Sequence, residues 1–239
     1  MKFPVLMYHK VENVARGDGL MVTTAQLESQ FLYLKKKRFN TISLSMLIDH
    51  AVYGKPLPEN PILISFDDGY KNNFTFLYPL LTKYNLKANI FLVADFIQTG
   101  KQANGDGYLH IKDINTMSQD VVEFGFHTYD HKSYARISIK EIEQDIYKMQ
   151  QRFAELKIAC QPCFAYAYGA FTRKDKEKQE ALEGLFRQFN IQLAFRIGNR
   201  MNILPLKNKF LIQRIDVTGH ENLWKFKLMC TLGKKWLPF

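Results

Sequence analysis

The residues best suited to chemistry are two adjacent carboxylates and two histidines, placed just after apolar segments of strand length. Asp67 and Asp68 follow one such segment, and His127 follows another, with His131 four residues further on. Two imidazoles at this spacing can face one point from a single turn of chain. With one carboxylate added, they form a ligand set with open positions, which suits zinc or another first-row metal. We therefore expect a metal centre here.

The adjacent carboxylates are suited to two different tasks. Neighbouring side chains point to opposite faces of a strand, so Asp67 and Asp68 need not do the same work. One can bind the metal, while the other accepts a proton from water whose pKa the metal lowers to about 7. A solvated acidic turn is the alternative, but two like charges after a fully apolar strand need a cation nearby.

Strand-length apolar segments alternate with helical patterns along most of the chain. Such alternation predicts an α/β fold with a parallel sheet and outer helices. The strand count favours a distorted or incomplete (β/α) barrel of about seven parallel strands, and no linker or repeat divides residues 1–239, so we expect a single domain. The expected strands are Val5–Tyr8, Ile62–Phe66, Ala88–Val93, Val121–Phe126, Phe164–Ala167, Leu193–Phe195 and Leu211–Val217, and the expected helices are Thr24–Lys37, Ser45–Val52, Phe74–Tyr84, Ile111–Met117, Ser138–Leu156, Lys174–Phe189 and Asn222–Leu232.

Polar residues gather where these expected strands end. In parallel α/β folds, functional residues collect at the carboxyl ends of strands. His9 ends the first expected strand, Asp67 and His127 end two others, and Tyr168 with Gly169 ends a fourth. We expect these residues to meet at one end of the barrel.

Three motifs resemble those of the polysaccharide deacetylases, the NodB-homology group also known as carbohydrate esterase family 4. Ser65–Gly69 resembles the S/T-F-D-D-G motif, His127–His131 resembles H-S/T-x-x-H, and Phe164–Gly169 resembles F-x-Y-P-Y-G. The motifs match in order and spacing, and the resemblance runs from about Val5 to about Val217. The first two in sequence are specific, whereas the third alone would be weak.

The resemblance implies a metal-dependent hydrolase that removes the N-acetyl group from an N-acetylhexosamine unit of a glycan or glycolipid. Asp67 would be the general base. Asp68, His127 and His131 would hold one divalent metal, zinc first, with iron, cobalt, nickel and manganese as alternatives. The resemblance further implies that Thr128 orders the histidine loop, that the backbone N–H of Tyr168 stabilises the oxyanion, and that Tyr8, Tyr166 and Gly169 bind substrate.

The general acid is expected near the start of the chain. The family's late L-x-H motif has no clear counterpart, and Leu6–His9 instead resembles the permuted poly-N-acetylglucosamine deacetylases, in which an early Tyr-His pair supplies the acid. We therefore expect His9 to be the acid. A structural histidine at a strand end is one alternative, and His220 is the rival donor.

The third motif departs from the family pattern. Ala167 replaces its proline, and the arginine that often pairs with the catalytic aspartate is missing. Arg214, on a late strand, is the best substitute and could tune Asp67 by charge pairing. A plain ion pair with Asp216 is equally consistent with the sequence.

The C-terminal segment and the net charge bear on partners. The formal net charge is +10, and residues 222–239 mix aromatic residues with lysines. This mixture predicts peripheral contact with an acidic membrane face, although a last helix packed on the barrel with a basic tail is the alternative. No leader and no spanning segment is evident, so we expect a cytoplasmic protein, peripheral at the inner membrane. No nucleic-acid-reading motif is present, and no nucleic acid is expected as a partner.

Two alternatives to the deacetylase function remain. A deformylase or other amide hydrolase could share the same metal centre. A non-catalytic sugar-binding relative is the second, but pure binding needs no base, and Asp67 is present. Cys160 and Cys163 have redox spacing, but Cys163 leads into an expected strand, so we expect buried or incidental thiols.

Overall fold

Seven parallel strands form a closed ring in the computed structural model, which describes residues 1–14, 19–99, 107–170 and 175–234. The (β/α) barrel of about seven parallel strands is thereby confirmed, and pairing between β2 and β6 closes the ring. A short additional strand, β5 (Asn40–Ile42), pairs with β6 outside the ring. Around the ring the order is β2 (Val5–Tyr8), β12 (Ile212–Asp216), β10 (Leu193–Ile197), β9 (Cys160–Ala165), β8 (Val122–Phe126), β7 (Ala88–Leu92) and β6 (Pro61–Phe66).

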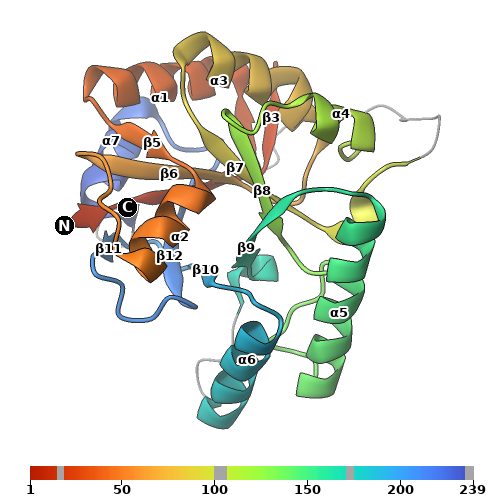
Figure 1. Ribbon diagram of the computed structural model, residues 1–239. Coiled ribbons are helices and arrows are strands. Elements are labelled where there is room, and N and C mark those ends of the chain that lie inside the picture. Colours follow the sequence, from red (N-terminus) through yellow and green to blue (C-terminus); the bar gives the residue numbers. More distant parts are fainter. Residues whose placement is uncertain (15–18, 100–106, 171–174, 235–239) are drawn as a thin grey trace.

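The helices lie outside the strands (Figure 1). All seven expected helices are present, with ends shifted by a few residues. The expected helix Phe74–Tyr84 opens with a π-helical turn, Asn73–Leu77, and Lys174 lies outside the described residues. The α-helices are α1 (Thr24–Lys36), α2 (Leu44–Tyr53), α3 (Tyr78–Tyr84), α4 (Ile111–Thr116), α5 (Ile139–Glu155), α6 (Lys176–Gln188) and α7 (Leu223–Leu232).

Among the described residues, four further strands are too short to leave a pattern in the sequence. β1 (Lys2–Phe3) pairs antiparallel with β11 (Asn202–Ile203), and β3 (Lys10–Glu12) pairs parallel with β4 (Met21–Thr23). Because β3 begins directly after His9, this pairing fixes the chain on the far side of that histidine.

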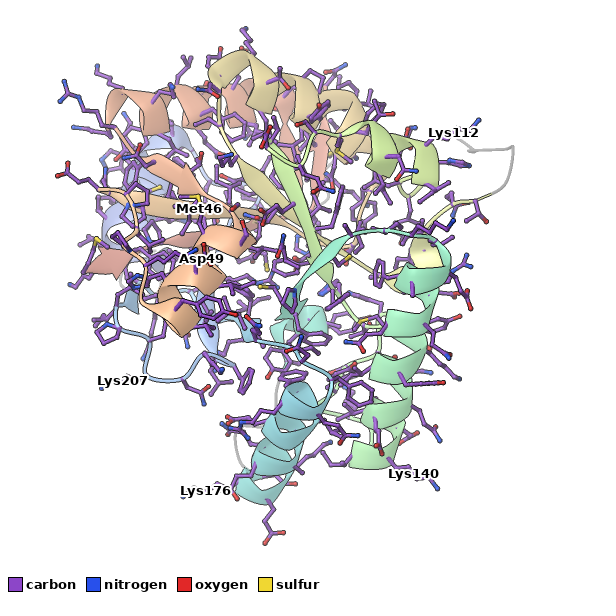
Figure 2. All side chains as sticks on the ribbon, in the orientation of Figure 1. Met46, Asp49, Lys112, Lys140, Lys176 and Lys207 are labelled. Atoms are coloured by element: carbon purple, nitrogen blue, oxygen red, sulfur yellow. The ribbon has the colours of Figure 1, made fainter. Side chains whose placement is uncertain are left out.

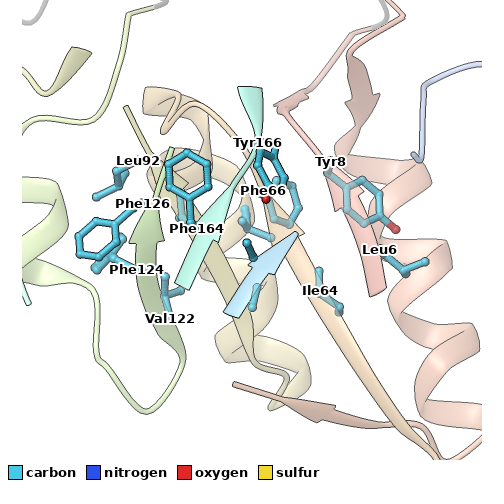
Figure 3. Close-up of a cluster of buried hydrophobic side chains, with 14 of the residues drawn as sticks. Leu6, Tyr8, Ile64, Phe66, Leu92, Val122, Phe124, Phe126, Phe164 and Tyr166 are labelled. Atoms are coloured by element: carbon cyan, nitrogen blue, oxygen red, sulfur yellow. The ribbon is translucent and has the colours of Figure 1, made fainter. Parts of the chain in front are cut away.

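Side chains of the barrel strands point alternately outward and inward. Figure 3 shows outward residues such as Leu6, Ile64 and Phe124, which belong to the cluster that packs under the helices. The alternate residues of the strands, such as Leu63 and Phe195, point into the barrel. They form a second buried cluster, to which residues of α2 also belong. Full burial of each such side chain contributes about 1.5–3 kcal/mol.

This alternation decides which polar residues face the interior. Val5 and Leu63 belong to the interior cluster, so the pleat directs His9 and Asp67, each an even number of residues further on, the same way. Arg214 follows the interior residue Ile212 in the same manner and is 0% exposed. The strand period thus brings distant polar residues to the carboxyl end of one barrel.

The net charge is +10, and no lysine among the described residues is buried. In Figure 2, Lys112, Lys140, Lys176 and Lys207 lie at the periphery of the molecule. Over the described residues, no helix combines the length and the apolar character needed to cross a membrane.

The cysteine pair lies in strand β9 and does not open a helix. Cys160 is half-buried, Cys163 is buried, and both thiols are free. Burial raises the pKa of the Cys163 thiol well above its ordinary value. The expectation of buried or incidental thiols is confirmed.

Candidate metal centre

Three side chains from two strand ends converge on one point. Asp68 Oδ1 lies 3.3 Å from His127 Nε2 and 3.2 Å from His131 Nε2, and the three ligand atoms all lie within 4.8 Å of one another. Asp68 Oδ1 is buried and has no hydrogen-bond donor among the described residues. Since metal–ligand distances are about 2.0–2.2 Å for these atom types, the spacing fits one cation between them.

The backbone turns sharply directly after β6 to place Asp68. Asp68 and Gly69 both have positive φ values, 71° and 73°. Aspartate tolerates this left-handed region better than most residues. The positive φ favours glycine at position 69, and a Cβ atom there would lie 2.7 Å from Leu92 Cδ2, so the end of that leucine would also have to move.

His127 is oriented by the neighbouring strand. Its Nδ1 lies 2.8 Å from the carbonyl oxygen of Ala165, and donation there leaves Nε2 as the free ligand atom. Burial lowers the pKa of His127, but the carboxylates of Asp67 and Asp68 raise it by more, so the net shift is upward.

His131 is placed by an unusual loop. Thr128 and His131 have positive φ values of 66° and 65°, which are uncommon for residues other than glycine. Thr128 Oγ1 accepts a hydrogen bond from His131 N at 2.8 Å, in agreement with the ordering role that the family resemblance implied. The Tyr168 ring lies 4.5 Å from the His131 ring, centroid to centroid.

Asp67 faces the same point but is held by Arg214. The two form a bidentate pair, with Nη1–Oδ1 at 2.5 Å and Nη2–Oδ2 at 2.7 Å. Burial raises the pKa of Asp67, but Arg214 and His127 lower it by more, so the carboxylate is ionised. The alternative pairing of Arg214 with Asp216 is therefore not the one adopted.

The two candidate acids lie in different surroundings. His9 is half-buried, its Nδ1 is buried without a hydrogen-bond partner in the described part of the chain, and its charge lowers the pKa of Asp67 and Asp68. His220 is exposed, and its ring lies beside Gly19. Of the two, His9 is the one near the carboxylates.

The structure corrects the expectation that Tyr8 and Tyr166 touch substrate. Both side chains are buried; Tyr8 donates to Gln30 Oε1 at 2.8 Å, and Tyr166 donates to the carbonyl oxygen of Phe210 at 3.1 Å. Each follows the outward alternation of its strand and packs under the helices. Gly169, the third residue of that set, has φ of 59°, and a Cβ there would clash with Ile197, so its identity is dictated by the fold.

Tyr168 combines exposure with an uncommon backbone. It has φ of 58° and a side chain that is 68% exposed, next to the metal-ligand cluster. A non-glycine residue held in this region costs of order 1–3 kcal/mol and is found mostly at functional sites. The turn Ala167–Gly169 that contains it begins where the expected strand Phe164–Ala167 was predicted to end.

Two features of the site escaped the sequence analysis. Asp145 of α5 accepts a hydrogen bond from Tyr129 N, within the histidine loop. The available signal was a charged residue on the apolar face of an amphipathic helix, between Ile142 and Ile146. The rings of Tyr70 and Tyr108, stacked at 5.1 Å, also lie near Asp68, whose charge helps to raise the pKa of both phenols after the larger effect of burial.

Comparison with known proteins identifies the family. The polysaccharide deacetylase family model matches residues 54–184, more than half of the chain, and the chain belongs to this family. YxkH of Bacillus subtilis (strain 168) is 25% identical over 179 residues, which are 75% of this chain and 61% of YxkH. The chain thus spans less than two thirds of that relative.

A second relative is the poly-beta-1,6-N-acetyl-D-glucosamine N-deacetylase of Staphylococcus aureus (strain MRSA252). It is 25% identical over 206 residues, 82% of this chain and 68% of the relative. Among solved structures, the deacetylase PplD of Streptococcus pyogenes in complex with acetate has a TM-score of 0.79 at 17% identity, covering 92% of this chain and 94% of PplD. That likeness establishes the shared NodB-type barrel fold.

Proposed function

We propose that this chain removes the N-acetyl group from an N-acetylhexosamine unit of a glycan or glycolipid, with one divalent metal, zinc. The observation that carries the proposal is the cluster of Asp68, His127 and His131 beside Asp67, in a chain of the polysaccharide deacetylase family. The Staphylococcus aureus relative, named for poly-β-1,6-N-acetylglucosamine, supports the substrate class.

Asp68, His127 and His131 would hold the metal. Two imidazoles, one carboxylate and open positions are the ligand set of catalytic zinc sites. When bound, the cation polarises the amide carbonyl and lowers the pKa of water.

Asp67 is the general base in this proposal. Its Oδ2 lies 3.8 Å from His127 Nε2 and so faces the ligand cluster. Arg214 keeps Asp67 ionised and fixes the plane of its carboxylate, so that it can accept the proton of the attacking water.

His9 and Tyr168 complete the hydrolysis. The backbone N–H of Tyr168 stabilises the negative oxygen that develops as water oxygen bonds to the amide carbon. His9 gives a proton to the amide nitrogen as the C–N bond breaks. The products are acetate and the free amino sugar.

The sharpest test is Asp67→Asn. Loss of a general base lowers the rate by about 10²–10⁴-fold, while the metal content should stay at one per chain because Asp68 and both histidines remain. The control is Asp49→Asn, which removes a surface ion pair with Lys55 and should leave acetate release unchanged. Normal turnover by Asp67→Asn contradicts the base assignment.

The choice of acyl group separates the proposal from its first alternative. Matched glucosamine oligomers carrying N-acetyl or N-formyl groups, and lipid-linked versions of each, are offered to the protein, and the N-acetyl substrates should be hydrolysed with release of acetate. Exclusive release of formate favours the deformylase. Sugar binding without release of either acid favours the non-catalytic relative.

We also propose a cytoplasmic enzyme that docks on the acidic face of the inner membrane through α7. Trp224 is 62% exposed, Leu223 and Lys227 are exposed beside it, and the net charge of +10 favours anionic lipid. Residues 235–239, part of the segment predicted for this contact, lie outside the described residues.

Vesicle flotation tests this docking. Trp224→Ala should reduce binding to anionic vesicles, whereas Tyr53→Ala, which removes an equally exposed ring from α2, should not. Equal flotation of both variants and the wild type contradicts docking through α7.

A further inference from the structure

Asp145 is a charged residue on the buried face of a helix. The buried residues of α5 are otherwise apolar: Ile142, Ile146, Met149 and Phe153. Burial raises the pKa of the Asp145 carboxyl, so the fold works against its charge. A buried polar group is costly unless its hydrogen bonds are satisfied.

The partners of Asp145 lie in and next to the histidine loop. Its Oδ2 accepts a hydrogen bond from Tyr129 N at 3.0 Å and another from the Tyr134 hydroxyl at 2.6 Å. Tyr129 stands between the two histidines of the candidate centre. Tyr134 is itself buried and stacks on Phe164 at 5.1 Å, so Asp145 ties the loop to the aromatic core.

The loop needs such anchors because its backbone is strained. Thr128 and His131 both occupy the left-handed region, which persists only where the surroundings impose it. On one side, Ala94 N and Asp95 N donate to the carbonyl oxygens of Thr128 and Tyr129, at 3.2 and 2.8 Å. On the other side, the bond from Tyr129 N to Asp145 comes from a side chain and can be removed by mutation.

We propose that Asp145 is the positioning residue that holds His127 and His131 at the spacing a metal requires. The inference rests on the proposed function, since it assigns Asp145 a role in the same centre. Asp145 touches neither imidazole and acts through the Tyr129 amide. Groups that orient metal ligands in this way typically contribute 10–100-fold to metal affinity.

Metal affinity of the full chain, measured by competition between Zn²⁺ and a chromophoric chelator, tests the role directly. Asp145→Ala should weaken Zn²⁺ binding by about 10–100-fold. Asp145→Asn keeps an acceptor oxygen for Tyr129 N, and its affinity should stay close to that of the wild type. If the alanine variant does not fold, Asp145→Leu fills the same space with an apolar group and should show the same weakening.

Glu221→Ala is the matched control. Glu221 is also a buried carboxylate, and it accepts one backbone N–H and one hydroxyl, both from Thr218, at 2.6 and 2.7 Å. Its loss should lower the melting temperature of the metal-free protein as Asp145→Ala does, but leave Zn²⁺ affinity unchanged. A merely structural Asp145 would make the two variants alike.

The outcomes separate the inference from the proposed function. Wild-type affinity in Asp145→Ala or Asp145→Leu overturns the positioning role and leaves the metal site intact. Equal weakening in Glu221→Ala also overturns it, since general destabilisation then explains the effect. A wild-type chain that binds no Zn²⁺ overturns both.

Discussion

Two loops at the carboxyl end of the barrel are each built on a buried carboxylate, but the carboxylate comes from different places. The His127–His131 loop takes Asp145 from a helix, α5. The Thr218–Glu221 loop supplies its own, and Glu221 also pairs with Lys234 at 2.8 Å. In both, the carboxylate accepts a backbone N–H and a hydroxyl.

The two loops differ in what they present. The first holds two imidazoles within reach of a third ligand, whereas the second leaves His220 exposed and leads into α7. A buried, hydrogen-bonded carboxylate is therefore no mark of a site by itself. What marks the site is the set of ligand atoms that the loop brings together.

The largest effect should come from the first loop. His127→Ala removes a metal ligand, so the variant should lose the metal. Acetate release should then fall by at least about 10³-fold, because a bound metal stabilises the charge of the transition state by several kcal/mol. Metal analysis and steady-state rates measure it. The counterpart in the second loop, His220→Ala, should retain both metal and rate. Loss of metal in His220→Ala would remove the contrast between the loops.

The next largest effect should come from breaking one of two ion pairs. Arg214 pairs with Asp67 beside the ligand cluster, and Lys234 pairs with Glu221 in the second loop. Arg214→Met leaves Asp67 charged and buried, and should cost about 3–5 kcal/mol in the free energy of unfolding. Lys234→Met breaks the partly exposed pair with Glu221 and should cost about 1 kcal/mol or less. Urea unfolding measures both. The double variant Arg214→Met with Asp67→Asn should recover part of the loss; no recovery would mean that the charge of Asp67 is not the cause.

The third contrast lies between the two candidate acids. His9→Ala should reduce acetate release by about 10²-fold or more, because the leaving nitrogen loses its proton donor. Full activity in His9→Ala, together with loss in His220→Ala, would transfer the acid to the second loop.

The smallest effect concerns stability against pH. Burial raises the pKa of Glu221, but Lys234 and Thr218 lower it by more, below its ordinary value of 4.5. A lowered folded-state pKa stabilises the fold above that value, and the contribution is lost as pH falls through the folded pKa. Wild type should therefore exceed Glu221→Gln in unfolding free energy at pH 7, with the difference shrinking below about pH 4.5.

The contribution of Asp145 to the free energy of unfolding should change with pH in the opposite direction. Its folded pKa is raised above 3.8, chiefly by burial. Its contribution is therefore fully present below that pH and declines as pH rises through the folded pKa. If the wild type gained on Asp145→Asn as pH rose, the direction of that shift would be wrong.

The barrel was predictable because its strands are buried on both faces. Continuous apolar segments marked seven strands, and the polar residues that followed them marked the carboxyl end. The contact of Arg214 with Asp67 could be named only as one of two options, since pairing across the ring depends on the register of strands far apart in sequence.

The residues and strands that were wrongly assigned or missed each have a physical explanation. Tyr8 and Tyr166 belong to the outward alternation, one residue out of step with the residues that face the interior. Asp145 stood out as a charged residue on the apolar face of a helix, but that signal does not name the loop to which its carboxylate is hydrogen-bonded. The short strands were missed because two or three residues show no period.

The closure of the ring also affects when the site can form during synthesis of the chain. Arg214 and Asp67 are 147 positions apart, and the strand of Arg214 pairs with the strand that precedes His9. During synthesis the N-terminal part emerges first, so Asp67 and Asp68 leave the ribosome long before the strand that completes their surroundings. A nascent chain that ends before Ile212–Asp216 lacks the partner of Asp67, and we expect no hydrolysis from it.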